Sequence, residues 1–210
     1  MPSVTRRPQA NRQQRREKVE RKLLAATERL MSGGASFTEL SVDRLATEAG
    51  ISRASFYIYF EDKGHLLRRL AGQVFGDLTG AAQLWWSVAD GHNPDDLHAG
   101  MAGIIAAYRR HQPLLIALNE MAAYDPPVGE TYRELLTGIA HRLGEVIERG
   151  QARGLVRAEV VPSVTASTLT WMVERTCQQN LPVQPPDYDA TLADTLTEII
   201  WGALYLTPPR

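Results

Sequence analysis

The side chains best suited to binding another molecule lie together in one short segment, GISRASFYIYFEDK, which runs from Gly50 to Lys63. Its arginine offers a planar fork of donors that matches the two acceptors on the edge of a guanine base. Its serine, tyrosine and lysine side chains have the hydroxyl and ammonium groups that contact phosphate oxygens in protein–DNA complexes. The segment therefore has the chemistry to contact DNA, provided that its backbone places these groups on one surface.

Whether that surface exists depends on the secondary structure of residues 56–60. Their aromatic and β-branched side chains favour a strand, but no partner strand is visible within hairpin reach. A helix needs only a cap, and Ser52 is of the residue type that caps helix N-termini. Wound at about 100° per residue, this helix places Phe56 and Phe60 on the side of Ser52. The opposite half then carries Arg53, Ala54, Tyr57 and Ile58.

Another short helix is expected just before this one. Ser41 is its N-cap, Asp43 adds a favourable negative charge in the first turn, and Gly50 ends it. Two short helices joined by a glycine turn form a helix-turn-helix, in which the second helix enters the major groove of DNA. Ser41 and Arg44, at the start of the first helix, are expected to hold the DNA backbone on the other wall of the groove.

The rest of the chain has apolar residues at helical spacing between Gly and Pro breaks, with no repeats and no clear strand alternation. The sequence therefore predicts an all-α protein of about nine helices. Besides the two short ones, the helices are expected over residues 14–31, 63–86, 94–108, 114–124, 128–153, 162–181 and 189–206.

The charges are divided unevenly along the chain, although the formal net charge is only −1. Residues 1–70 hold 14 Lys and Arg against 8 Asp and Glu, whereas residues 71–210 hold 9 against 16. The basic first third favours a polyanionic partner there, and a merely solvated basic tail is an equally good reading of the charge alone. The same two readings apply to Arg12, Arg15 and Arg16, as an arm on DNA or as a solvated tail.

Several classes of protein are disfavoured. No apolar run has the length of a membrane span, and no apolar segment follows the basic N-terminus, so we expect a cytoplasmic protein without a membrane partner. The single Cys177 agrees with a reducing compartment. No hydrolase, nucleotide-binding or metal motif is present, so we expect no enzyme activity, no cofactor and no metal. His98 and His111 are read as surface residues at helix ends, and Glu174-Arg175 as a buried ion pair or a solvent-facing pair.

The segment LSVDRLATEAGISRASFYIYFEDKGHLL closely resembles the DNA-binding motif of the TetR family of transcriptional regulators, and the resemblance covers residues 16–67. Beyond it, WMVERT and DTLTEIIW are similar to the EthR branch of that family. The resemblance implies a disordered basic arm over residues 1–14, a helix-turn-helix domain over 15–62 and a regulatory domain over 63–210. It implies contacts to bases and phosphates from Ser52, Arg53, Ala54, Ser55, Tyr57 and Tyr59, and a phosphate contact from Lys63. Ser52 also serves as a cap, and core packing is the alternative for Tyr59.

The resemblance also implies that the regulatory domain binds a small hydrophobic effector and forms a homodimer through its last two helices. Apolar and aromatic residues at helical spacing are the candidates for the pocket, with core packing as the alternative: Met101, Ile104, Tyr108, Met121, Tyr132, Leu136, Ile139, Trp171 and Met172. A C2 dimer would read two half-sites. Its candidate interface residues, with the same alternative, are Leu169, Met172, Val173, Leu192, Leu196, Ile199, Ile200 and Ala203.

The function expected from these patterns is a TetR-type repressor that leaves a palindromic operator when the effector binds. A transcriptional activator of the same family is one alternative, because the sign of regulation depends on where the operator lies. A helical protein that sequesters a ligand and a non-specific nucleoid-type DNA binder are the rivals from other classes. Neither rival needs a capped recognition helix.

Overall fold

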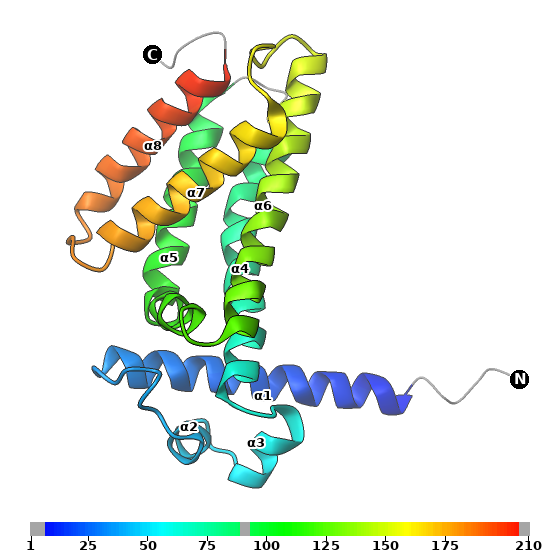
Figure 1. Ribbon diagram of the computed structural model, residues 1–210, viewed down its shortest axis with the longest axis vertical. Helices are drawn as coiled ribbons and strands as arrows, with labels where there is room; N and C mark the ends of the chain where they lie inside the picture. Colours follow the sequence, from blue (N-terminus) through cyan, green and yellow to red (C-terminus); the bar gives the residue numbers. More distant parts are fainter. Residues whose placement is uncertain (1–6, 89–92, 206–210) are drawn as a thin grey trace, which may run out of the picture.

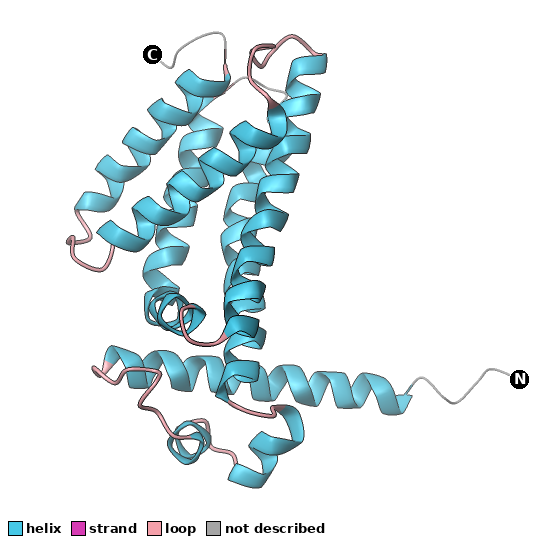
Figure 2. Ribbon diagram, viewed as in Figure 1, coloured by secondary structure: helices cyan, strands magenta, loops and turns pink. Residues whose placement is uncertain are grey.

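The computed structural model describes residues 7–88 and 93–205, and within them the chain is helical, as the sequence predicts (Figure 2). The one β feature in these ranges is an isolated antiparallel bridge between Val156 and Tyr205. No helix in the described ranges is long and apolar enough to cross a membrane. The helices are α1 (Arg7–Ser32), α2 (Val42–Glu48), α3 (Arg53–Tyr59), α4 (Lys63–Val88), α5 (Pro94–Ala122), α6 (Pro126–Ala152), α7 (Pro162–Asn180) and α8 (Tyr188–Leu204).

The helices form two parts that meet at α1 (Figure 1). Helix α1 lies across one end of a bundle made by α4 to α8, and α2 and α3 lie on the far side of α1. Helix α4 starts beside α3 and runs up into the bundle, where it packs against α5 and α6. Helix α6 also packs against α7, and α5 against α8. Helix α4 is therefore a direct mechanical link between the two parts.

Capping residues and prolines explain where the bundle helices begin. The side chains of Asn93 and Asp125 accept hydrogen bonds from the backbone N–H groups of Asp95 and Val128, so they cap α5 and α6. Proline stands at the start of α5, α6 and α7, where its missing N–H costs nothing. Each start thus agrees with a signal that is readable in the sequence.

Two of the expected helices are a single helix in the structure. We expected a break before Leu114, but Pro113 lies inside α5. A proline inside a helix removes one backbone hydrogen bond and bends the axis, and Figure 1 shows the last turns of α5 nearly end-on while its first turns are seen from the side. The helix continues because Leu114 and Leu118 after the proline are fully buried.

The helical part of the N-terminal region is longer than the sequence indicated. Residues 7–14, which we assigned to a disordered arm, belong to α1. Pairs one turn apart support this helix, since Gln13 donates to Glu17 at 2.9 Å and Arg16 donates to Glu20 at 3.1 Å. Residues 1–6 of the expected arm lie outside the described residues.

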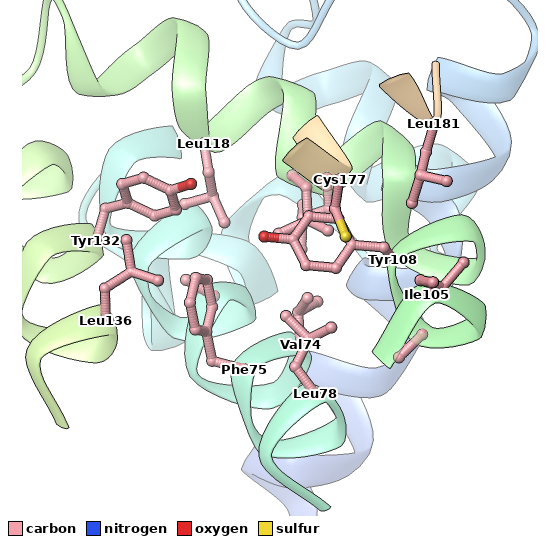
Figure 3. Packing of buried hydrophobic residues seen from close by; sticks show 14 of the residues in the cluster. Val74, Phe75, Leu78, Ile105, Tyr108, Leu118, Tyr132, Leu136, Cys177 and Leu181 are labelled. Carbon is pink, nitrogen blue, oxygen red and sulfur yellow. The ribbon is translucent and has the colours of Figure 1, made fainter. Parts of the chain in front are cut away.

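A hydrophobic core runs through both parts of the molecule. Figure 3 shows its middle, where Phe75 of α4, Tyr108 of α5 and Tyr132 of α6 approach one another. The rings of Phe75 and Tyr132 meet edge to face, with their centroids 5.7 Å apart. Cys177 of α7 is fully buried beside Tyr108, and this burial, with a smaller effect of nearby carboxylates, raises the pKa of its thiol to about 12.

Candidate nucleic-acid interface and ligand pocket

Serine caps set the geometry of the helix-turn-helix. The Ser41 hydroxyl accepts a hydrogen bond from the backbone N–H of Arg44 at 3.2 Å, at the start of α2. The Ser52 hydroxyl accepts one from the backbone N–H of Ser55 at 3.0 Å, at the start of α3. Both caps satisfy N–H groups that a helix start leaves without a partner. The helix expected from residue 52 is thereby confirmed, in place of a strand.

Between the two helices the backbone turns at Gly50, whose φ of 64° lies in the left-handed region. The Gly50 N–H donates to the carbonyl of Thr47 at 3.0 Å, and the Ile51 N–H donates to that of Ala46 at 2.9 Å. This pair of bonds ends α2 in the way that favours glycine after a helix. The turn leaves only Gly50, Ile51 and the cap Ser52 before α3 begins, so it fixes the angle between the helices.

The two faces of α3 differ as predicted. Phe56 and Phe60 are buried, and their rings pack with centroids 5.3 Å apart. Tyr57 and Ile58 are 47% and 74% exposed, which is unusual for such large apolar side chains. Tyr59 is half-buried and packs against the core, so core packing describes it better than base contact does.

Arg53 is held in place on the exposed face. Its Nη1 donates to Asp43 Oδ2 of α2 at 2.7 Å, and both side chains are more than half exposed. Its guanidinium carbon lies 5.7 Å from the centre of the Tyr57 ring. These contacts restrict the rotamers of the arginine without covering it, so its fork of donors stays open toward solvent.

Lys63 is half-buried, and its ammonium already has hydrogen-bond partners within the chain. Its ammonium donates to the carbonyls of Thr38 at 2.8 Å and Phe37 at 3.3 Å, and it lies 5.6 Å from the centre of the Phe37 ring. Burial lowers the pKa of Lys63. An ammonium has three N–H groups, so one of them remains for a phosphate.

The remaining predicted DNA contacts surround this face. Ser41, Arg44, Ser52 and Ala54 are exposed, and Ser55 is half-buried. The Ser52 and Ser55 hydroxyls lie 2.8 Å apart and bond to each other. The structure therefore brings the predicted residues to one surface formed by α2 and α3, with Tyr59 and Lys63 at its margin.

An apolar pocket lies inside the bundle, away from this surface. Helices α4 to α8 contribute to its walls, which enclose a cavity of about 70 Å³. Of the side chains predicted for it, five line the pocket: Met101, Ile104, Tyr108, Leu136 and Ile139. The apolar and aromatic lining suits a small hydrophobic molecule.

Four predicted pocket residues lie elsewhere. Tyr132, Trp171 and Met172 line a second hollow, formed by α5, α6 and α7, and Met121 is half-buried against the core. The wall made by α4 was missed, because our candidates included no residue of that helix. The lining residues not predicted for the pocket are Phe75, Leu78, Thr79, Ala82, Trp86, Leu143, Leu169, Thr170, Val173, Glu174 and Ile200.

One buried carboxyl group stands between the pocket and this hollow. Glu174 lines both and accepts a hydrogen bond from the Tyr132 hydroxyl. Burial raises the pKa of Glu174 and the pKa of Tyr132. Arg175 instead is exposed and bonds to Gln178 at 2.6 Å, so residues 174 and 175 form neither of the pairs that we considered.

Half of the eight residues predicted for the dimer interface belong to the core of the single chain. The helical spacing that we used also marks that core, and the four buried residues are Leu169, Leu192, Leu196 and Ile200. Val173 is half-buried on the pocket wall, and Met172 and Ala203 are half-buried. Ile199 is 47% exposed and remains available.

A capped helix-turn-helix with an exposed arginine and tyrosine, joined to a helical bundle with an apolar pocket, defines a DNA-binding regulator with a ligand-binding domain. Residues 23–70 match the family model of bacterial regulatory proteins of the tetR family, and residues 97–206 match that of the C-terminal domain of the transcriptional regulator EthR. The chain therefore belongs to the TetR family of transcriptional regulators and has an EthR-type C-terminal domain. It is a regulator and not an enzyme.

Known proteins agree with this assignment. The HTH-type transcriptional regulator EthR of Mycobacterium tuberculosis H37Rv is 27% identical over 87% of this chain and 85% of its own length. EthR of Mycolicibacterium smegmatis is 28% identical over 99% of this chain and 96% of its own length.

Solved structures show the same fold at lower identity. A TetR transcription regulator from Haloarcula marismortui is 18% identical, with a TM-score of 0.69 over 90% of this chain and 99% of its own. FadR from Bacillus subtilis, solved in complex with stearoyl-CoA, is 13% identical, with a TM-score of 0.69 over 88% of this chain and 98% of its own.

Proposed function

We propose that the protein is a homodimeric repressor that binds a palindromic operator through α2 and α3 and leaves it when a small hydrophobic effector occupies the bundle pocket. The observation that carries the proposal is the solvent-facing side of α3, where Arg53 is fixed by Asp43 and stands beside the exposed Tyr57. An effector that favours the form unable to bind DNA by about 1–3 kcal/mol is sufficient for regulation.

A homodimer is supported by apolar surface on the last two helices. Val164 and Trp171 of α7 are 62% and 41% exposed, and Ile199 of α8 is 47% exposed. One recognition helix reads only a few base pairs, so two-fold pairing of such a surface supplies the second half-site. These residues replace the buried leucines of our sequence-based interface.

The pocket walls favour an uncharged effector with a hydrogen-bond acceptor. In the described part of the chain, two buried polar atoms on these walls lack a hydrogen-bond partner, Trp86 Nε1 and Thr170 Oγ1. An indole N–H can only donate, and a hydroxyl can donate as well. The lining includes no Lys, Arg or His, and it includes Glu174. A carbonyl on a hydrophobic body fits this wall, whereas a carboxylate would lack a cationic partner and would lie near Glu174.

Ligand preference is therefore predictable. A medium-chain alkyl ester or amide should bind more tightly than the carboxylic acid of the same length at neutral pH. Thr170→Val and Trp86→Phe should each weaken ester binding by about 2–12-fold, because a neutral hydrogen bond contributes about 0.5–1.5 kcal/mol. Isothermal titration measures both effects.

The matched control for that titration is an alkane of similar size, whose affinity should change little in the two variants. Tighter binding of the acid than of the ester would contradict the assignment of effector chemistry. So would equal losses of alkane and ester affinity, because these would indicate a packing defect.

The regulatory function itself is tested by selecting bound fragments from random DNA. We expect a palindrome whose half-sites are about one helical turn, or a multiple of it, apart, and a dimer mass in solution. Retention of scrambled DNA with equal affinity would identify the non-specific binder, and ligand binding without retained DNA would identify the sequestering protein. A promoter fusion distinguishes repression from activation by the sign of its response.

A further inference from the structure

His111 of α5 is buried in the place where the two parts of the molecule meet. We had read this histidine as a surface residue, but only 4% of it is exposed. Its Nδ1 lies 2.6 Å from Glu28 Oε1 of α1, and its Nε2 lies 2.9 Å from Asp77 Oδ2 of α4. One imidazole ring therefore joins the last turns of α1 to the middle of α4 and α5. We call these three residues the His111 clasp.

The arrangement has a definite proton requirement. An ionised carboxylate only accepts hydrogen bonds, and a neutral imidazole has one N–H and one nitrogen lone pair. Two carboxylates can both be satisfied only if both ring nitrogens carry a proton. In the neutral ring, one nitrogen lone pair would face a carboxylate oxygen at hydrogen-bond distance. A ring with a proton on both nitrogens donates to both carboxylates, whereas a ring with one proton donates to only one of them.

The charges around the ring agree with this reading. Among the described residues, the groups that contact it are Glu28 from α1 and Asp77 from α4. Further along α1, the buried Glu20 already has its own cations, because Arg16 and Arg69 donate to it at 3.1 and 3.0 Å. On α5, Arg109 is bound to Asp189 of α8 and Arg110 is exposed.

A metal ion is not the explanation for the cluster. The described residues contain no group of three or more His, Cys, Asp or Glu side chains arranged to hold one. The two carboxylates lie at opposite nitrogens of the ring, whereas a metal would need its ligands to converge on one point. The ring therefore bridges two carboxylates that lie on opposite sides of it.

The clasp also lies between the pocket and the DNA-binding face. On α4, Asp77 directly precedes Leu78 and Thr79, and on α5, His111 follows Tyr108 by one turn; all three neighbours line the pocket. On α1, Glu28 precedes Arg29, which donates to the side chain of Glu48 in α2 at 2.7 Å and to its carbonyl at 3.2 Å. These contacts connect α4 and α5 through α1 to α2.

We propose that the His111 clasp is a proton-dependent coupling element that fixes the DNA-binding helices to the ligand-binding bundle, so that protons regulate operator binding together with the effector. Recognition helices that are held rigidly lose less conformational freedom when they bind two half-sites. The clasped, protonated form therefore binds the operator more tightly. This inference rests on the proposed function. Its test also includes the melting temperature, which does not depend on DNA binding.

The experiment measures operator affinity between about pH 6 and pH 8, the interval in which histidine side chains change charge. The wild type should lose about fivefold or more in affinity as pH rises, a loss of the size of a typical allosteric coupling. In Glu28→Gln, operator affinity should be the same at pH 8 as at pH 6. The glutamine amide can donate to one nitrogen of the neutral ring while the other nitrogen donates to Asp77. A flat wild-type profile overturns the proposal, as does an unchanged slope in Glu28→Gln.

Two matched controls separate the clasp from general effects of charge. Glu17→Gln makes the same substitution on an exposed part of α1, and His141→Gln removes an exposed histidine whose ring lies 3.6 Å from Glu145. Both variants should retain the pH slope of the wild type. His65 is tested too, because it lies in α4 beside the helix-turn-helix and packs against Phe60. If His111 is responsible, His65→Gln should also retain the slope. Loss of the slope in any of the three contradicts the assignment to His111.

The readout independent of DNA is the melting temperature. The clasp stabilises the fold while the ring is protonated, so its contribution is present at low pH and is lost as pH rises. The wild type should therefore lose melting temperature relative to Glu28→Gln between pH 6 and pH 8. Parallel melting curves overturn the clasp. If the melting temperatures of the wild type and Glu28→Gln differ in their pH dependence as expected but no operator binding is found, the proposed function is rejected and the clasp is retained.

Discussion

Phe56→Ala is expected to lower the free energy of unfolding by about 3–5 kcal/mol, the usual cost of removing a buried phenylalanine side chain. Phe56 is fully buried, and its ring contacts those of Tyr57 and Phe60 at centroid distances of 5.5 and 5.3 Å. It is the anchor of a helix of only seven residues, which cannot persist in water without tertiary contacts. Urea denaturation followed by circular dichroism measures the loss, and operator binding should disappear with α3.

Ile58→Ala is the matched control for that experiment, because Ile58 lies two residues further along the same helix and is 74% exposed. Its removal should change the free energy of unfolding by less than about 0.5 kcal/mol. Equal losses of stability in the two variants would contradict the assignment of the buried and exposed faces of α3.

The helix-turn-helix could be predicted because its signals are local. Ser41 and Ser52 cap their helices through side-chain bonds to residues three positions later, and Gly50 supplies the left-handed turn between them. Capping and turn chemistry of this kind depend on a few neighbouring residues, so a single sequence is sufficient to recognise them.

The boundaries that failed depend on more distant contacts. Pro113 is an ordinary stop signal, but the burial of Leu114 and Leu118 outweighs the lost hydrogen bond and keeps α5 continuous. We assigned residues 1–14 to a disordered arm, but Gln13 bonds to Glu17 one turn later, and residues 7–14 belong to α1. A propensity scale alone does not weigh these contacts.

The pocket and the dimer surface could be predicted only in part, for one physical reason. An apolar residue at helical spacing marks a face that will be buried, but it does not say whether the neighbour is the same chain, a ligand or a partner subunit. Leu192 and Leu196 have that spacing and are core, whereas Trp171 has it and is exposed. His111 was missed because its carboxylate partners lie 34 and 83 positions away in the sequence.

Arg53→Ala is expected to remove the base preference at one position of each half-site. A bidentate contact of arginine to guanine contributes about 1–3 kcal/mol of discrimination, so affinity for the preferred operator should fall by about 5–150-fold. The structure supports a direct base contact, because the guanidinium is already oriented by Asp43 and Tyr57 and is exposed on the face of α3. Competition binding with operators substituted at single positions measures both effects.

Two further variants separate base contact from charge in that experiment. Arg53→Lys keeps the positive charge but has no planar fork, so it should lose the base preference while the dependence of affinity on salt stays the same. Lys63→Ala should weaken all DNA sequences alike and reduce the salt slope by about 1. It should also lower stability, because the ammonium bonds to the carbonyls of Phe37 and Thr38. Unchanged base preference in Arg53→Ala would show that α3 reads the operator through other side chains, and the exposed Tyr57 would then be the first to test.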